Sequence, residues 1–187
     1  MGKIILVTGG ARSGKSRFAE QYAARYGKNI AYIATAEVHD EEMAFRVSLH
    51  RKRRPASWQT FEAPFDAHLA LAEAGREHDM VLFDCLTLYI SNMLCAAPDL
   101  QDADAIYAHL QDKIEALLAQ AEKNEGTTIF VTNEVGSGIV PENQLSRVYR
   151  DMAGLANQWM AKGAAEVYLV VSGLPVNIKK IAETLGE

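Results

Sequence analysis

The chain has 187 residues, of which 49% are hydrophobic, and it carries a formal net charge of −5. This length suffices for one sizeable core and is too short for two full domains, so we expect a single domain over residues 1–187. The negative charge argues against a surface dedicated to nucleic acids or anionic membranes, and it favours a small-molecule partner.

The cysteines and the apolar runs limit the class of protein further. Cys85 and Cys95 lack C-x-x-C spacing, so the sequence predicts neither a disulfide framework nor a zinc site. It contains neither a signal-peptide pattern nor an apolar run as long as a membrane span. We therefore expect a cytoplasmic protein without a membrane span.

The first predicted strand covers residues 4–7 and leads into the glycine-rich stretch GGARSGKS. Gly9, Gly14, Lys15 and Ser16 match the P-loop pattern G-x-x-x-x-G-K-[ST], and a helix is predicted from Ser16 onward. In this pattern backbone N–H groups surround the phosphates, the lysine pairs with the β and γ oxygens, and the hydroxyl binds Mg²⁺. A glycine-rich turn that holds no ligand is the alternative, and the position between a strand and a helix disfavours it.

Apolar runs alternate with helix-like segments along the rest of the chain. The runs cover residues 3–9, 29–35, 79–87, 127–135 and 166–173. They are continuously apolar, as expected for strands buried on both faces of a parallel sheet. The sequence thus predicts an α/β fold of the P-loop NTPase-like (RecA-like) type, with a mostly parallel sheet flanked by helices.

Ligands of such sheets bind at the carboxyl ends of the strands. The polar residues predicted there are Thr8, Thr35, Asp84, Thr87, Thr132, Asn133, Glu134 and Ser172. Asp84 closes the run MVLFD as a Walker B acid would, where its carboxylate could orient Mg²⁺. Glu134 is the competing candidate, and capping of the next helix is the alternative role for Asp84.

A less ordinary segment covers residues 35–62. Its stretch DEEMAFRVSLHRK predicts a helix from Asp40, with acids in the first turn and bases in the last, and Pro55 prevents its continuation. Arg46 and His50 share one face of this helix. Neighbouring cations would keep the His50 imidazole neutral and able to attack phosphorus, although a solvated basic face is the plainer interpretation. The other histidines, His39, His68, His78 and His109, show no metal-binding spacing, and we expect them at the surface.

Five motifs together resemble one enzyme family. They are GGARSGKS, the IAT of residues 33–35, D-x-E-M-x-x-R, H-R-x-x-R-P-x-x-W, and TNEVGSGIVPENQLSRVYRD. In this combination the chain resembles the adenosylcobinamide kinase / adenosylcobinamide-phosphate guanylyltransferase family nearly from end to end. The last motif, together with the HRxxRP element, is the most specific part of the resemblance.

The resemblance implies a bifunctional enzyme of cobalamin (vitamin B12) biosynthesis. Such an enzyme phosphorylates adenosylcobinamide with ATP or GTP, then transfers GMP from GTP to the new phosphate, giving adenosylcobinamide-GDP and pyrophosphate. The family's covalent guanylyl-histidine falls on His50. Leu49 stands where some relatives have a second histidine, and Arg53 stands where the family can have a glycine.

The resemblance also implies which residues contact the nucleotide. The implied set is Gly9, Gly10, Ala11, Arg12, Ser13, Gly14, Lys15, Ser16, Ala34, Thr35, Ala36, Arg51, Lys52, Arg53, Arg54, Glu62 and Asp84. Mg²⁺ would be bound through Ser16 and Asp84. The implied assembly is a homotrimer or a small multiple of it, with an open cleft shared between subunits. The loop TNEVGSGIVPENQ would face either the corrinoid or a neighbouring subunit; the alternative is an ordinary mobile loop after a strand, for which Gly136, Gly138 and Pro141 suffice.

Some alternatives remain open at this stage. A P-loop kinase with one activity would keep Lys15 and Asp84 and leave His50 chemically idle. A GTPase-type switch is disfavoured, because NEVG at residues 133–136 lacks the lysine and the acid of N-K-x-D. For the kinase step, Asp84, Glu62 and Glu134 are all candidates for the general base.

Overall fold

Strand β1 (Lys3–Thr8) lies in the interior of a seven-stranded sheet in the computed structural model, which describes residues 1–37, 41, 44, 45, 47, 48, 51, 54–97 and 102–183. The strand order is β3-β2-β4-β5-β1-β6-β7. Six strands run parallel, and β7 pairs antiparallel with β6. The remaining strands are β2 (Ile30–Ala34), β3 (Gln59–Glu62), β4 (Met80–Asp84), β5 (Thr127–Val131), β6 (Glu166–Val171) and β7 (Leu174–Asn177).

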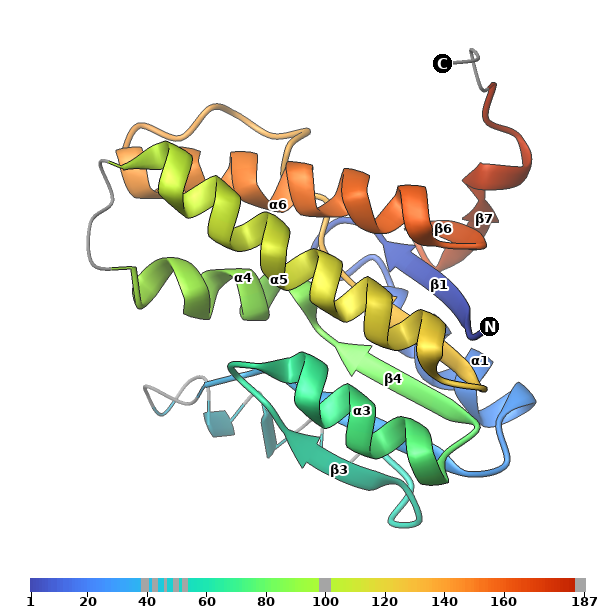
Figure 1. The fold of residues 1–187 in the computed structure, drawn as a ribbon. Helices are drawn as coiled ribbons and strands as arrows, with labels where there is room; N and C mark the ends of the chain where they lie inside the picture. Colours follow the sequence, from blue (N-terminus) through green and yellow to red (C-terminus); the bar gives the residue numbers. More distant parts are fainter. Residues whose placement is uncertain are drawn as a thin grey trace.

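Helices cover both faces of this sheet (Figure 1). Helix α1 (Lys15–Tyr26) packs on one face by itself among the described elements. The opposite face carries α3 (Ala67–Glu77), α4 (Leu86–Cys95), α5 (Ala103–Lys123) and α6 (Gln144–Gly163). A short 3₁₀ helix, Ile178–Lys180, follows β7. None of the helices in the described ranges is long and apolar enough to cross a membrane.

The sheet has a hydrophobic core on each face, and alternate residues of each central strand belong to one core or the other. In β1, Ile4 and Leu6 pack beneath α3 to α6, whereas Ile5 and Val7 pack beneath α1. Successive side chains of a strand point to opposite faces, so a strand covered on both sides must be apolar at every position. This explains the continuous apolar runs, and it confirms the predicted α/β, P-loop NTPase-like architecture.

The five predicted strands are present, and each ends before the predicted run does, most clearly β4 and β5. β4 ends at Asp84, and helix α4 begins at Leu86, so residues 85–87 do not extend the strand. β5 ends at Val131, and the polar residues after it form a loop that reaches to α6. Apolar and β-branched residues continue past the ends of β4 and β5, so the composition does not show where these strands end.

Two strands were not predicted from the sequence, and both lie at edges of the sheet. β3 has the sequence QTFE and is mostly exposed, while β7 contains Pro175, which has no N–H to donate to a neighbour. Edge strands need neither apolar character nor regular alternation, so they lack the pattern that marks buried strands. The helix predicted over residues 40–52 falls mainly on residues outside the described ranges.

Candidate functional site

The loop between β1 and α1 has a backbone path that requires glycine at two positions. Gly14 has φ of 96°, in the left-handed region, directly before the first residue of α1. At Gly9, a Cβ atom would lie 2.4 Å from the carbonyl oxygen of Val170. The Gly173 N–H donates to the Ser13 carbonyl at 2.8 Å, which joins the loop to the chain after β6. The loop is therefore held against the end of β6. Its backbone N–H groups lie next to the N-terminus of α1.

Polar groups of this loop gather around Lys15, which is half-buried. The Lys15 ammonium donates to the Gly10 carbonyl at 3.1 Å, and burial lowers its pKa, with Cys85 and Asp84 acting in the opposite direction. The buried hydroxyls of Thr8 and Ser13 have no hydrogen-bond partner within the part of the chain that the structure describes. Backbone N–H groups at a helix N-terminus, a cation and unpaired hydroxyls together form an arrangement suited to phosphate oxygens.

Asp84 lies at the carboxyl end of β4, and β5 separates its strand from β1. The Tyr32 hydroxyl donates to Asp84 Oδ2 at 3.0 Å, and Tyr32 is only 3% exposed. Burial, followed by the Asp84 charge, raises the Tyr32 pKa well above its usual value, so the phenol keeps its proton. Because a protonated phenol can donate, Tyr32 fixes the position of the carboxylate.

Tyr32 also contacts the basic segment, residues 51–54, which lies at the end of the predicted helix and just after it. The Arg54 guanidinium carbon lies 3.6 Å from the centroid of the Tyr32 ring, a cation–π contact. The apolar composition of residues 29–35 gave no indication of this role for Tyr32. The available signal was register: Tyr32 lies two residues before Ala34, which pairs with Asp84, so both side chains lie on the same face.

Thr35 is fully buried, and its polar groups bond within the protein. Its hydroxyl donates to the Cys85 carbonyl at 2.7 Å and accepts from the Cys85 N–H at 2.9 Å. Its carbonyl accepts from the Asn92 side chain at 2.8 Å. Thr35 therefore braces the turn that follows Asp84, while the neighbouring predicted contacts Ala34 and Ala36 are half-buried.

The described part of the basic segment rests on β3 and β2. Arg51 forms an ion pair with Glu62, and Arg54 donates to the Thr60 hydroxyl at 3.2 Å. These contacts bring Arg51, Arg54 and Glu62 to the end of the sheet where the parallel strands have their carboxyl ends. Asp84 lies at the same end, because Glu62 and Asp84 both pair with Ala34. Four predicted residues of this region, Arg46, His50, Lys52 and Arg53, lie outside the described residues.

Glu134 differs from Asp84 in its surroundings. Its side chain is exposed and accepts from the Gly136 N–H at 2.7 Å, while its own N–H donates to the Gly9 carbonyl. Asp84 is half-buried, and its charge acts on Lys15. This difference favours Asp84 over Glu134 as the acid that faces the phosphates. In the described ranges, no three His, Cys, Asp or Glu residues are grouped closely enough to hold a metal ion by themselves.

The expected surface histidines require a correction. His68 and His78 are half-buried on the apolar side of α3 and at its end, and His78 Nδ1 lies 2.9 Å from the Ala74 carbonyl. The ring of Phe61 on β3 packs edge-on against His78, a contact that the spacing of histidines could not indicate. His109 is exposed as expected, and His39 lies outside the described residues.

A family model and three relatives of this chain all indicate the same enzyme family. The family model described as "Cobinamide kinase / cobinamide phosphate guanyltransferase" matches residues 5–178. The bifunctional adenosylcobalamin biosynthesis protein CobU of Salmonella typhimurium is 42% identical over 181 residues, which are 94% of this chain and 99% of that protein. CobU of Escherichia coli is 41% identical over 181 residues, again covering 94% and 99% of the two chains. CobP of Pseudomonas aeruginosa is 44% identical over 178 residues, covering 93% and 96%. On this similarity, which extends over nearly the whole chain, the protein belongs to the cobinamide kinase / cobinamide phosphate guanyltransferase family.

Proposed function

We propose that this chain catalyses both reactions of its family, phosphorylation of adenosylcobinamide and guanylyl transfer to the resulting phosphate. The observation that carries the proposal is the juxtaposition of Lys15 and Asp84, with Arg51 and Arg54 docked at the same sheet edge. The family description and the relatives' names support it with the same pair of activities. Both reactions would use one domain over residues 1–187.

In the kinase step, the loop would hold a triphosphate and present its γ-phosphorus to the substrate hydroxyl. That oxygen attacks the γ-phosphorus, the bond to the β-phosphate oxygen breaks, and the nucleoside diphosphate leaves. The loop N–H groups and the Lys15 ammonium stabilise the charge that shifts onto the β-phosphate. Glu62 and Glu134 are the candidates for the base that takes the hydroxyl proton, because Asp84 accepts from Tyr32 and is proposed to bind Mg²⁺.

Mg²⁺ fits the residues that the site contains. This ion takes one or two protein oxygens together with phosphates and water, so it does not need a cluster of three acids. The Ser16 hydroxyl in the first turn of α1 and the Asp84 carboxylate would bind it, with Tyr32 fixing the carboxylate. When bound, the ion would offset the charge of the phosphate oxygens.

In the guanylyl step, His50 would act as the nucleophile. A neutral imidazole nitrogen attacks the α-phosphorus of GTP, and the bond to the β-phosphate oxygen breaks, releasing pyrophosphate. An oxygen of adenosylcobinamide phosphate then attacks the same phosphorus, and the phosphorus–nitrogen bond breaks to restore His50. The residues proposed for the nucleotide site are residues 9–16, 34–36, 51–54, Glu62 and Asp84. Within this set, Thr35 does not contact the nucleotide directly, because its hydroxyl bonds to the backbone of Cys85 and so supports the turn after Asp84.

A labelling experiment tests this proposal. Wild type incubated with GTP labelled at the α-phosphate should retain covalent label that is stable to base and labile to acid. His50→Ala should lose the label and the transferase activity but keep part of the kinase activity, because the kinase step needs no nucleophile on the protein. His78→Gln, at the opposite end of β4, is the matched control and should label normally. Label on His50→Ala would place the nucleophile elsewhere, and an unlabelled wild type with intact kinase activity would favour a kinase of one activity.

We also propose that the chain assembles as a homo-oligomer, a trimer or a small multiple of it. The loop between β5 and α6 supports this, because Ile139 is 95% exposed and Val140 is 60% exposed in the single chain. Sedimentation equilibrium should give a mass of at least three chains. A monomer at micromolar concentration would contradict this part of the proposal.

A further inference from the structure

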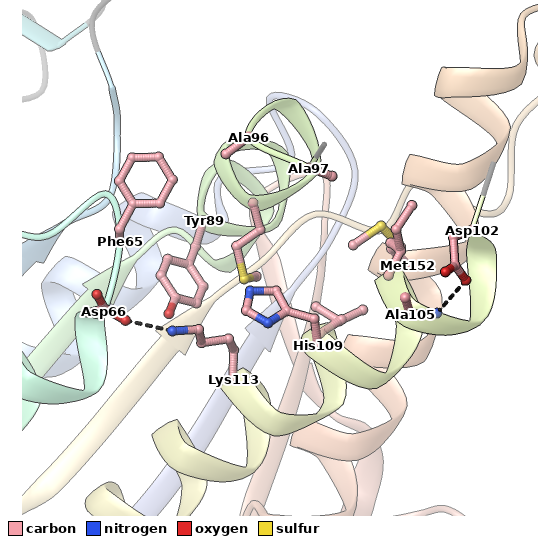
Figure 2. A pocket seen from close by; sticks show the side chains of 13 residues that line it. Phe65, Asp66, Tyr89, Ala96, Ala97, Asp102, Ala105, His109, Lys113 and Met152 are labelled. Atoms are coloured by element: carbon pink, nitrogen blue, oxygen red, sulfur yellow. Dashed lines mark hydrogen bonds and ion pairs between the residues drawn. The ribbon is translucent and has the colours of Figure 1, made fainter. Parts of the chain in front are cut away.

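A cavity of about 510 Å³ lies between the start of α3, helix α4 and the first half of α5 (Figure 2). Its walls are mainly apolar and include Met93, Ile106, Leu110 and Met152. Apolar cavities of this volume with a few polar groups are typical of small-molecule sites. The P-loop residues do not line it, so it is separate from the proposed phosphate site.

One polar group in this cavity lacks a partner. Tyr89 lines the cavity with none of its surface exposed, and its hydroxyl proton has no acceptor among the described residues. Figure 2 shows this hydroxyl near Asp66 and Lys113. Burial raises the pKa of Tyr89 to about 12, and the N–H of Ala67 acts in the opposite direction. The phenol therefore keeps its proton at neutral pH, and an unused donor in a buried position indicates a ligand with an acceptor.

An ion pair lies next to this hydroxyl. The Lys113 ammonium is 2.6 Å from Asp66 Oδ1, and the two charges offset each other. A ligand group here faces one positive and one negative charge, so a group that both accepts and donates hydrogen bonds suits the site better than a group of a single charge. A neutral primary amide has a carbonyl oxygen that accepts hydrogen bonds and, beside it, an N–H₂ group that donates them. The oxygen would accept from Tyr89 and Lys113. The N–H₂ group would donate to Asp66.

The cavity borders the edge of the sheet where the nucleotide site is proposed. Helix α4 begins two residues after Asp84, and Tyr89 lies in its first turn. Phe65 and Asp66 follow β3, which ends at Glu62. A substrate part bound in the cavity would therefore belong to a molecule whose reacting end lies at the same edge.

We propose that this cavity binds the amide-bearing, methyl-rich edge of the corrinoid substrate. The inference rests on the proposed function, since cobinamide is the molecule that the family phosphorylates. The corrin ring carries methyl groups and primary amide side chains at its periphery. Methyl groups match the apolar walls, and one amide matches the polar group formed by Tyr89, Lys113 and Asp66. The macrocycle is larger than the cavity, so only its edge enters.

Two variants test the cavity, with kinase activity and corrinoid binding as readouts. Tyr89→Phe removes only the unpartnered hydroxyl, so the folded state should keep its stability while KM for adenosylcobinamide rises about fivefold. Ala105→Phe places a ring in the cavity from an exposed position on α5 and should raise the same KM more than tenfold. KM for the triphosphate and kcat at saturating corrinoid should stay unchanged. Tyr107→Phe, on α5 but outside the lining, is the matched control.

Equilibrium dialysis of adenosylcobinamide without nucleotide measures corrinoid affinity directly, and both variants should weaken it by the same factors. A corrinoid KM within twofold of wild type in both variants would overturn the cavity assignment and leave the proposed function intact. Loss of the oligomer in Ala105→Phe would overturn it in favour of an interface between copies of the chain. A wild type that does not phosphorylate cobinamide would contradict the proposed function itself, and the cavity assignment with it.

Discussion

Tyr32 joins two parts of the candidate site that are far apart in the sequence. Its hydroxyl donates to Asp84, and its ring carries the Arg54 guanidinium. A hydrogen bond to a charged acceptor is stronger than one between neutral groups, and burial of the phenol excludes competing water. At the scale of single residues, Tyr32 is therefore a positioning residue, since it acts through the carboxylate that is proposed to bind Mg²⁺.

Substitution of Tyr32 by phenylalanine separates its two contacts. Tyr32→Phe keeps the ring beneath Arg54 but removes the donor to Asp84, a bond worth about 1.5–3 kcal/mol. We expect kinase kcat to fall about tenfold or more and the Mg²⁺ concentration for half-maximal activity to rise, with KM for the triphosphate little changed. Steady-state kinetics over a range of Mg²⁺ concentrations measure this. Tyr26→Phe, at a 60% exposed position, is the control. An unchanged Mg²⁺ dependence would mean that Tyr32 only packs.

Lys15 is the residue on which both activities should depend. In either proposed reaction the triphosphate would lie in the same loop, and its charge would have to be offset there. Lys15→Ala should reduce kinase and transferase rates by at least about 10²- to 10³-fold. Product formation from each reaction, together with a circular dichroism spectrum that matches wild type, measures this. If one activity persisted near its wild-type rate, the two reactions would use separate sites.

At the scale of elements, the P-loop depends on its contact with the end of β6. A Cβ at Gly9 would lie 2.4 Å from the Val170 carbonyl and 2.6 Å from the Ser13 hydroxyl, closer than real contacts allow. Gly10, the next residue, has no atom within 4 Å of its Cβ position. The same substitution at two adjacent glycines should therefore have opposite outcomes for the fold.

This pair gives a stability test that needs no substrate. Gly9→Ala must displace backbone of β6 or of the loop, so we expect the free energy of unfolding to fall by about 2 kcal/mol or more. Gly10→Ala should change it by less than about 0.5 kcal/mol. Urea denaturation of both variants measures the difference. Equal stability of the two would show that the loop relaxes freely and is not held against β6.

At the scale of the whole molecule, a polar cluster joins the central strand to the C-terminal hairpin. Glu166 on β6 forms an ion pair with Lys3 on β1, and it accepts from Tyr168 and from the Asn177 amide of β7. The hydrogen bond from Lys3, followed by that from Tyr168, lowers the Glu166 pKa, and the bond to Glu166 raises the Lys3 pKa. The Lys3 side chain is 42% exposed, so solvent screens the pair.

The pH dependence of stability follows from these directions. A carboxylate with a lowered pKa stabilises the folded state above its ordinary pKa near 4.5, and this contribution is lost as pH falls through the lowered value. Lys3 gives the corresponding loss above pH 10.5. Glu166→Gln should lower the free energy of unfolding at pH 7 by about 0.5–1 kcal/mol. The difference from wild type should shrink as pH falls below 4.5.

Urea denaturation between pH 3 and pH 8 measures this difference. Asp112→Asn, which removes an exposed acid on α5, is the control and should leave the shape of the profile unchanged. A Glu166→Gln profile parallel to wild type down to pH 3 would show that Glu166 titrates alike in both states.

The sequence by itself determined the elements whose signals are local. Continuous apolar runs marked five strands, and four of them, β1, β2, β4 and β5, are buried along nearly their whole length. The glycine and lysine spacing of residues 9–16 marked the loop and the start of α1, and the family motifs identified the chemistry. The edge strands β3 and β7 were not predicted, because strands at an exposed edge carry no periodic apolar pattern.

Only the tertiary structure decided which distant residues meet. Tyr32 and Asp84 are 52 positions apart, and Thr35 and Cys85 are 50 apart. Their contacts follow from the parallel register of β2 with β4, which no local pattern specifies. The cavity around Tyr89 likewise depends on how α4 and α5 pack beside the start of α3. Local sequence sets the conformation of each element, whereas strand order and helix packing set the partners, because those depend on the free energy of the assembled core.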